Sequence, residues 1–138
     1  MTSKPRCTPP LAFIYDRHAT PTKAIMLLRV GACREYAEEQ GWEIAGEWVD
    51  DGDNALTDDN RPQFDLMLAE LLGTHRGGRT VVCVVTDWDR LSRDSWNRLI
   101  FARKVALAGG WIETIVGETT KPEARSRGLL TRAPEVGA

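Results

Sequence analysis

A run of five apolar residues, Val81-Val82-Cys83-Val84-Val85, is followed after Thr86 by the charged segment Asp87-Trp88-Asp89-Arg90-Leu91-Ser92-Arg93-Asp94. A short, uninterrupted run rich in β-branched residues is typical of a strand that is buried on both faces of a parallel sheet. Ligands of open α/β sheets bind beyond the carboxyl ends of such strands. The sequence therefore predicts a binding site in the charged segment, although solvated charges at the start of a loop would give the same pattern.

Length, charge and cysteine content limit the possible functions. The chain has 138 residues, which suits one domain with a single core. Its formal net charge is -2, so a polyanion such as DNA would have to be held by a local basic patch. The three cysteines, Cys7, Cys33 and Cys83, form no CxxC pair and no grouping with histidine at metal-ligand spacing. This pattern argues against a disulfide framework and for a reducing compartment.

No apolar stretch in the sequence is long enough to span a bilayer, and residues 1–10 lack the apolar region of a signal peptide. We therefore expect a cytoplasmic protein with no membrane partner, no cofactor and no bound metal.

Strand and helix patterns alternate along the chain. Strands are expected over residues 11–15, 42–49, 81–85 and 111–116. Helices are expected from Pro21, with Thr20 as N-cap, to Gly41, from Arg61-Pro62 to Gly73, and from the cap Asp94 to Gly109-Gly110. This alternation predicts an α/β domain with a mostly parallel sheet of about four strands and helices on both faces. Residues 1–10 are expected to be a disordered leader.

Each expected helix carries side chains at helical spacing that should face a core. These are Met26, Val30, Cys33 and Ala37 in the first helix, Phe64, Met67, Leu68 and Leu71 in the second, and Trp96, Leu99, Ile100, Arg103 and Leu107 in the third. Trp42, Trp48, Trp96 and Trp111 lie on expected regular elements, so we interpret them as core or interface residues rather than as platforms for stacked bases.

Four arginines are expected to gather at one edge of the sheet. The first and third strands end at the same edge, where Tyr15-Asp16-Arg17-His18 would face the segment from Asp87 to Arg93, and Arg61 can reach the same place. Arg17, Arg61, Arg90 and Arg93 would repel one another unless an anion lay between them, and guanidinium groups match phosphate oxygens well. The predicted ligand is a phosphate.

Simpler interpretations exist for the same residues taken singly. Arg17 could be a surface residue, Arg61 could pair with Asp58 or Asp59, and Asp89 could cap a turn or orient Arg90. His18 and His75 have no partner at the spacing of a catalytic triad or a metal site, so we expect both at the surface. The acidic residues from Asp50 to Asp59 lack the spacing of an EF-hand and are expected to form a solvated loop.

Several segments together resemble the catalytic domain of serine site-specific recombinases of the resolvase/invertase type. The matching pieces are Tyr15-Asp16-Arg17, Cys33-Arg34-Glu35-Tyr36-Ala37, Gly41-Trp42-Glu43, Arg61-Pro62 before Phe64, and Asp89-Arg90-Leu91-Ser92-Arg93-Asp94. The resemblance runs from about Leu11 to Glu118, and it implies the three-layer fold of that family over residues 11–118, with residues 119–138 as a flexible tail.

The resemblance also implies roles for individual residues. In that family a serine two residues after the first arginine attacks the DNA phosphate and forms a covalent phosphoserine link without a metal. By position, Arg17, Arg61, Arg90 and Arg93 match the arginines that bind the phosphate, and Asp89 matches the accompanying acid. The nucleophile position holds Ala19, and the adjacent Thr20 is a weak candidate to replace it. Lys23 and Arg29 stand about where the family has glutamines.

These observations support one leading hypothesis and two alternatives. The leading hypothesis is a recombinase-like domain that binds DNA phosphate without strand exchange, since Ala19 has no hydroxyl and the chain ends before a long dimerisation helix or a DNA-reading domain. Its expected partner is the DNA phosphate backbone, and a second copy of the chain or a full-length recombinase is a further possible partner. The alternatives are a Toprim-like, Mg²⁺-dependent nuclease using Asp16, Asp87 and Asp89, and a protein-interaction module without catalysis.

Overall fold

The computed structural model describes residues 8–19, 22–52, 57–58 and 60–122. Its elements follow the order β1 (Leu11–His18), α1 (Ala24–Glu39), β2 (Glu43–Asp51), α2 (Pro62–Arg76), β3 (Val81–Val85), the 3-10 turn η3 (Trp88–Arg90), α3 (Ser95–Leu107) and β4 (Trp111–Thr114). The predicted alternation of strands and helices is confirmed.

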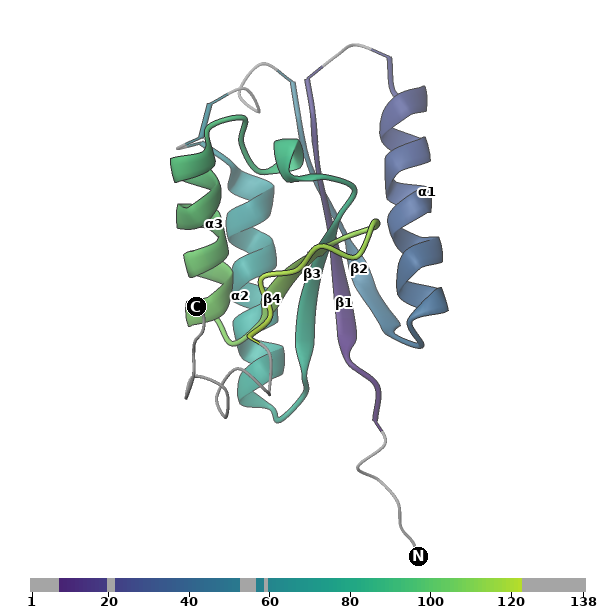
Figure 1. Cartoon of the computed structure of the whole chain (residues 1–138), viewed down its shortest axis with the longest axis vertical. Helices are drawn as coiled ribbons and strands as arrows, with labels where there is room; N and C mark the ends of the chain where they lie inside the picture. The colour runs from purple at the N-terminus through teal and green to yellow at the C-terminus, as the bar shows by residue number, and fades with distance from the viewer. Residues whose placement is uncertain (1–7, 20–21, 53–56, 59, 123–138) are drawn as a thin grey trace, which may run out of the picture.

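The four strands form one parallel sheet in the order β2-β1-β3-β4. Helix α1 covers one face of this sheet, and α2 and α3 cover the other (Figure 1). This is the expected three-layer α/β arrangement, and it places the carboxyl ends of β1 and β3 side by side at one edge.

Burial along β1 and β3 explains why these two strands are central. All five residues of β3 are buried, and so are seven of the eight residues of β1. Their side chains alternate between two cores, with Phe13 and Tyr15 packing toward α2 and α3 while Ala12 and Ile14 pack toward α1. The interpretation of the run 81–85 as a doubly buried strand is correct.

The first two strands extend further than the sequence predicted. Strand β1 continues to His18, beyond its expected end at residue 15, and β2 continues to Asp51, beyond its expected end at residue 49. The two ends pair in register, since Arg17 lies opposite Asp50 and His18 opposite Asp51. Polar residues here remain in regular strand because backbone pairing with a neighbouring strand outweighs their low strand propensity.

Two helix boundaries also differ from the prediction. Helix α1 begins at Ala24, with Lys23 at the N-cap and no side-chain cap hydrogen bond, rather than at Pro21 with Thr20 as cap. Thr20 and Pro21 themselves lie outside the described residues. Helix α2 runs through Gly73 to Arg76, so this glycine does not end it. Gly41, with φ of 82°, follows the end of α1 in the left-handed conformation that glycine adopts freely, as predicted.

The prediction of which face of α3 is buried is wrong. Trp96, Leu99 and Leu107 are 68%, 62% and 72% exposed, and the helix instead buries Phe101 and Val105. The faces of α1 and α2 agree with the prediction, since Val30, Cys33 and Ala37 are buried in the first and Phe64, Met67 and Leu71 in the second. Both faces of α3 carry apolar side chains, so spacing alone could not tell which of them meets the sheet.

The segment after β4 returns to that strand. Thr119 forms an antiparallel bridge with Glu113, and the Thr120 N–H donates to the Ile112 carbonyl at 2.9 Å. Thr119 and Thr120 of the expected tail are therefore paired with β4, while residues 123–138 lie outside the described part, as do residues 1–7 of the expected leader. None of the described helices is both long and apolar enough to cross a membrane.

Candidate phosphate-binding site

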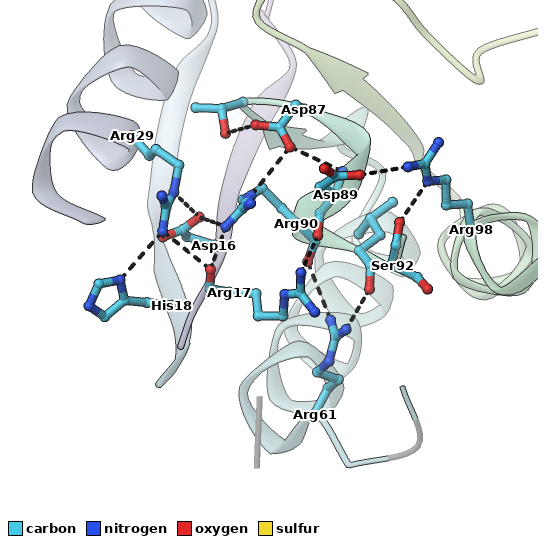
Figure 2. A network of polar contacts seen from close by, with 12 residues as sticks. Asp16, Arg17, His18, Arg29, Arg61, Asp87, Asp89, Arg90, Ser92 and Arg98 are labelled. Atoms are coloured by element: carbon cyan, nitrogen blue, oxygen red, sulfur yellow. Dashed lines mark hydrogen bonds and ion pairs between the residues drawn. The ribbon is translucent and has the colours of Figure 1, made fainter. Parts of the chain in front are cut away.

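The ends of β1 and β3 are joined by arginine side chains, as Figure 2 shows. One Nη of Arg17 donates to the carbonyl of Asp89 at 2.9 Å, and one Nη of Arg90 donates to the carbonyl of Arg17 at 2.8 Å. These reciprocal bonds hold the segment after β3 against the end of β1. The predicted meeting of Arg17 with the charged segment is confirmed by this geometry.

Arg61 lies at the same edge but is a buried structural residue. Its side chain is 2% exposed and donates to the carbonyls of Thr57, Arg90 and Leu91. It also pairs with the carboxylate of Asp58 at 3.0 Å. Arg61 thus ties the start of α2 to the segment after β3, and its donors are turned to protein acceptors.

Arg90 is held by carboxylates. Its Nε lies 3.3 Å from Asp87, and one Nη lies 3.9 Å from Asp16. Asp87 also accepts from the backbone N–H of Asp89 at 3.0 Å and so caps the turn η3. Repulsion within the arginine cluster is therefore relieved in part by protein groups, without an external anion.

Arg17 and Arg93 lie together at a pocket next to the arginine cluster. Both line a pocket of about 220 Å³, together with Asp58, Ser92 and Asp94. Arg93 is exposed and forms no hydrogen bond or ion pair within the described part of the chain. Burial lowers the pKa of Arg17, and the neighbouring charges of Arg61, Arg90 and Arg93 lower it further. A bound anion would offset this repulsion.

Asp89 has a different partner from the one expected. Its carboxylate accepts from Arg98 at 2.6 Å, and Arg98 also donates to the carbonyl of Ser92 at 2.6 Å. Asp89 therefore holds the segment after β3 to α3, and the carboxylate that orients Arg90 is Asp87. Arg98 was missed in the sequence, where it lies one turn into a helix and resembles any solvated helix residue.

Asp50 is not part of a solvated loop. It is 3% exposed, accepts from the Tyr15 hydroxyl at 2.7 Å, and accepts from the backbone N–H groups of Gln63 and Phe64 at 2.8 and 3.1 Å. The carboxylate therefore caps the N-terminus of α2 from the end of β2, where a negative charge is favoured. The signal available in the sequence was an aspartate at the end of a strand that precedes a helix.

His18 is buried on the α1 side of β1, which contradicts its predicted place at the surface. It is 1% exposed, and its Nδ1 lies 3.4 Å from an Nη of Arg29. Arg29 pairs with both carboxylate oxygens of Asp16, at 2.8 and 3.0 Å (Figure 2). Arg29 therefore secures the strand end beneath the site. His75 is exposed, as expected.

Comparison with known proteins is consistent with this fold. A family model described as Resolvase, N terminal domain matches residues 12–131. The chain belongs to the resolvase N-terminal domain family. No curated protein sequence matches the chain.

Solved structures similar to this resolvase-type domain come from recombinases and an integrase. They include the N-terminal catalytic domain of TP901-1 integrase (18% identity, 86% of this chain and 87% of the other, TM-score 0.65). A resolvase family site-specific recombinase from Streptococcus pneumoniae has 19% identity over 88% of this chain and 83% of the other, with a TM-score of 0.61. The C-terminal catalytic domain of ISC1926 TnpA, an IS607-like serine recombinase, has 19% identity over 84% and 72%, with a TM-score of 0.56. These likenesses confirm the predicted fold.

The hydroxyl groups of described residues near the arginines include those of Tyr15, which accepts from Arg61 at 3.3 Å, and Ser92. Ala19 follows directly after β1, and Thr20 lies outside the described residues. Ser92 lines the pocket, but its hydroxyl donates to Asp58 at 2.7 Å and accepts from the Asp94 N–H at 3.0 Å. Asp94 in turn caps α3 by accepting from the Trp96 N–H, as predicted. The Ser92 hydroxyl is therefore committed to structure.

The three aspartates of the nuclease alternative are paired with cations. Arg29 holds Asp16, Arg90 holds Asp87 and Arg98 holds Asp89. Across the described ranges there is no group of three or more metal-ligating side chains. The geometry therefore gives no support to a Mg²⁺ site at these residues.

Proposed function

We propose that this resolvase-type domain binds the phosphate backbone of DNA between Arg17 and Arg93 and leaves the strand uncut. The observation that carries this proposal is Ala19, which follows Arg17 by two residues and stands where the family resemblance implies a serine nucleophile, while Arg17 and Arg93 line one pocket. A methyl group cannot attack phosphorus, so the arginines can stabilise a bound phosphate but have no covalent step to assist. Arg61, Arg90 and Asp89 then position this pocket rather than contact the ligand.

The binding is expected to be weak and to depend on salt. The chain carries a net charge of -2, so attraction comes from the local pocket and not from the whole molecule. The affinity for duplex DNA, followed by fluorescence anisotropy across a salt series, should fall as salt rises. Replacing Arg93→Ala should reduce the slope of log affinity against log salt by about 1, because about one phosphate contact is lost. Equal affinities and equal slopes for the two proteins would contradict the proposal.

The covalent chemistry is tested separately. After incubation with DNA and denaturation, the wild-type protein should give no protein–DNA adduct on a gel. Ala19→Ser, which returns a hydroxyl to the nucleophile position, is expected to give one because the arginines remain in place. An adduct from the wild-type protein would refute the inactive assignment and point to Thr20 or another nucleophile.

A single pocket contacts few phosphates, so stable residence on DNA is proposed to need a second chain, either another copy or a full-length recombinase. We place this activity in the cytoplasm. The buried, unpaired thiols of Cys33 and Cys83 are compatible with a reducing compartment.

A protein-interaction function is the second candidate, and the exposed apolar side chains of α3 favour it. Trp96, Leu99, Ile100 and Leu107 are all more than 40% exposed. In this case retention on DNA would not respond to salt, and neither Arg90→Ala nor Arg93→Ala would change the protein's function.

A further inference from the structure

A second, larger pocket adjoins the arginine pocket. It has a volume of about 480 Å³ and is lined by Asp58, Asn97, Ile100, Phe101 and Lys104. Asp58 also lines the arginine pocket, so the two cavities share a wall. Its volume lies in the range of about 300–1,000 Å³ that is usual for sites of small organic ligands.

The two pockets follow one face of α3. Asn97, Phe101 and Lys104 recur at intervals of four and three residues, and Arg93 stands just before the helix on the side of the shared Asp58 wall. From the cap Asp94 to Lys104, a rise of 1.5 Å per residue gives about 15 Å. A groove of this length has room for a phosphate at one end and a sugar and base along the rest.

The lining of the larger pocket suits a nucleoside. Ile100 supplies an exposed apolar surface, and the buried Phe101 forms the floor. Asn97 donates its amide N–H to Asp58 at 2.6 Å, which leaves its carbonyl oxygen as an acceptor with no partner within the described part of the chain. The carboxylate of Asp58 is itself satisfied, because Arg61 and Ser92 donate to it as well.

Lys104 places a positive charge at the end of the larger pocket that is farther along α3 from Arg93. Its Nζ lies 5.4 Å from the centre of the Phe101 ring, over which the Arg61 guanidinium also lies at 5.0 Å. Lys104 forms no ion pair with any residue that the structure describes. A cation and an amide carbonyl on an apolar floor can meet the hydrogen-bonding edge of a base, whereas a pocket for phosphate alone would not need the apolar part.

We propose that the larger pocket binds the nucleoside of a nucleotide whose phosphate lies between Arg17 and Arg93. This inference rests on the proposed phosphate site and adds its ligand class: a free mononucleotide or an unpaired nucleotide of DNA. A base stacked in a duplex would first have to leave the stack, which costs free energy that an unpaired base does not pay. Single-stranded DNA is therefore expected to bind more tightly than the same length of duplex.

The test uses the full chain and a matched pair of variants. Lys104→Ala removes the cation that lines the pocket, and Arg103→Ala removes its exposed neighbour, which does not line it. Binding is measured for a fluorescein-labelled single-stranded hexanucleotide, for deoxyadenosine 5′-monophosphate and for inorganic phosphate. Lys104→Ala should weaken hexanucleotide binding by about five-fold or more relative to Arg103→Ala and leave phosphate binding unchanged. Ile100→Trp, which fills the groove, should weaken hexanucleotide binding in the same way, and circular dichroism checks that each variant is folded.

The outcomes separate this inference from the function on which it rests. If Lys104→Ala and Arg103→Ala behave alike while Arg93→Ala abolishes phosphate binding, the nucleoside pocket is refuted and the phosphate site stands. If the wild-type protein binds neither phosphate nor DNA, both fail. Mononucleotide binding as tight as that of the hexanucleotide supports a free nucleotide as the ligand, and much tighter hexanucleotide binding supports DNA.

Discussion

Asp50→Ala should destabilise this domain far more than a surface aspartate would. The substitution removes a buried carboxylate that accepts three hydrogen bonds, from the Tyr15 hydroxyl and from the backbone N–H groups of Gln63 and Phe64. Loss of the helix cap alone costs about 0.5–2 kcal/mol. Leaving a buried hydroxyl without its charged acceptor adds about 1–3 kcal/mol. We expect a combined loss of about 1.5–5 kcal/mol in the free energy of unfolding.

The assay is urea denaturation followed by tryptophan fluorescence, with Asp51→Ala as control. Asp51 is the next residue of β2, but its side chain is 38% exposed and pairs with Lys23 at 3.3 Å. Such a surface pair contributes about 0–1 kcal/mol, so the control should stay close to the wild type. Equal denaturation midpoints for Asp50→Ala and Asp51→Ala would refute the assignment of Asp50 as the cap of α2.

The Tyr15 hydroxyl, which donates to Asp50, also makes the stability of the domain depend on pH. Burial raises the pKa of Tyr15 above its ordinary value of 10.0, and the hydrogen bond to Asp50 raises it further. The folded state therefore holds this phenol neutral, so its contribution to stability is complete below pH 10.0 and is lost as the pH rises above that value. Tyr15→Phe should lose stability more slowly than the wild type between neutral pH and pH 11 or so.

Three further predictions concern side chains whose burial the structure reveals. Arg61→Ala should cost about 1–3 kcal/mol of stability because it removes a buried guanidinium that donates to three backbone carbonyls and to the partly exposed Asp58, so the loss of DNA binding in this variant must be accompanied by a lower denaturation midpoint. On α3, Leu99→Ser should change stability by no more than about 0.5 kcal/mol, whereas Val105→Ala should cost about 1–3 kcal/mol in the same urea assay; the reverse order would mean that the helix is rotated. Burial raises the pKa of the Cys33 thiol to about 12, and it raises the pKa of the Cys83 thiol as well. Neither thiol should therefore react with a thiol reagent at pH 8 until the protein unfolds. A Cys7→Ser variant, which removes the third cysteine, allows this to be measured.

Much of the fold follows from local pattern. The run 81–85 is a doubly buried strand, and the helix faces built on Val30 and Phe64 are the ones that meet the sheet. Short apolar runs and helical spacing carry enough information here because each element buries a face that has no polar competitor. The meeting of Arg17 with Arg90 agrees with the rule that parallel strands end at one edge, whereas the direct pairing of β1 with β3 is known only from the structure.

The site was predicted less completely than the fold. His18 and Asp50 were expected in solvent because polar residues after a strand usually lie in a loop, but pairing between β1 and β2 keeps both buried. The outward face of α3 was mistaken for its inner one because both faces are apolar, and only packing against the sheet selects Phe101 and Val105.

The sequence by itself determined the layered α/β fold, the family resemblance and the alanine at position 19, because these depend on residue identity and on spacing along the chain. Only the tertiary structure decided where each arginine of the cluster lies. Arg61 and Arg90 donate to carbonyls and carboxylates of distant segments, whereas Arg17 and Arg93 line the pocket, and Arg93 has no hydrogen bond to any described residue. Whether a guanidinium serves the fold or a ligand depends on which acceptors the fold brings within hydrogen-bond distance, and spacing along the chain does not specify those acceptors.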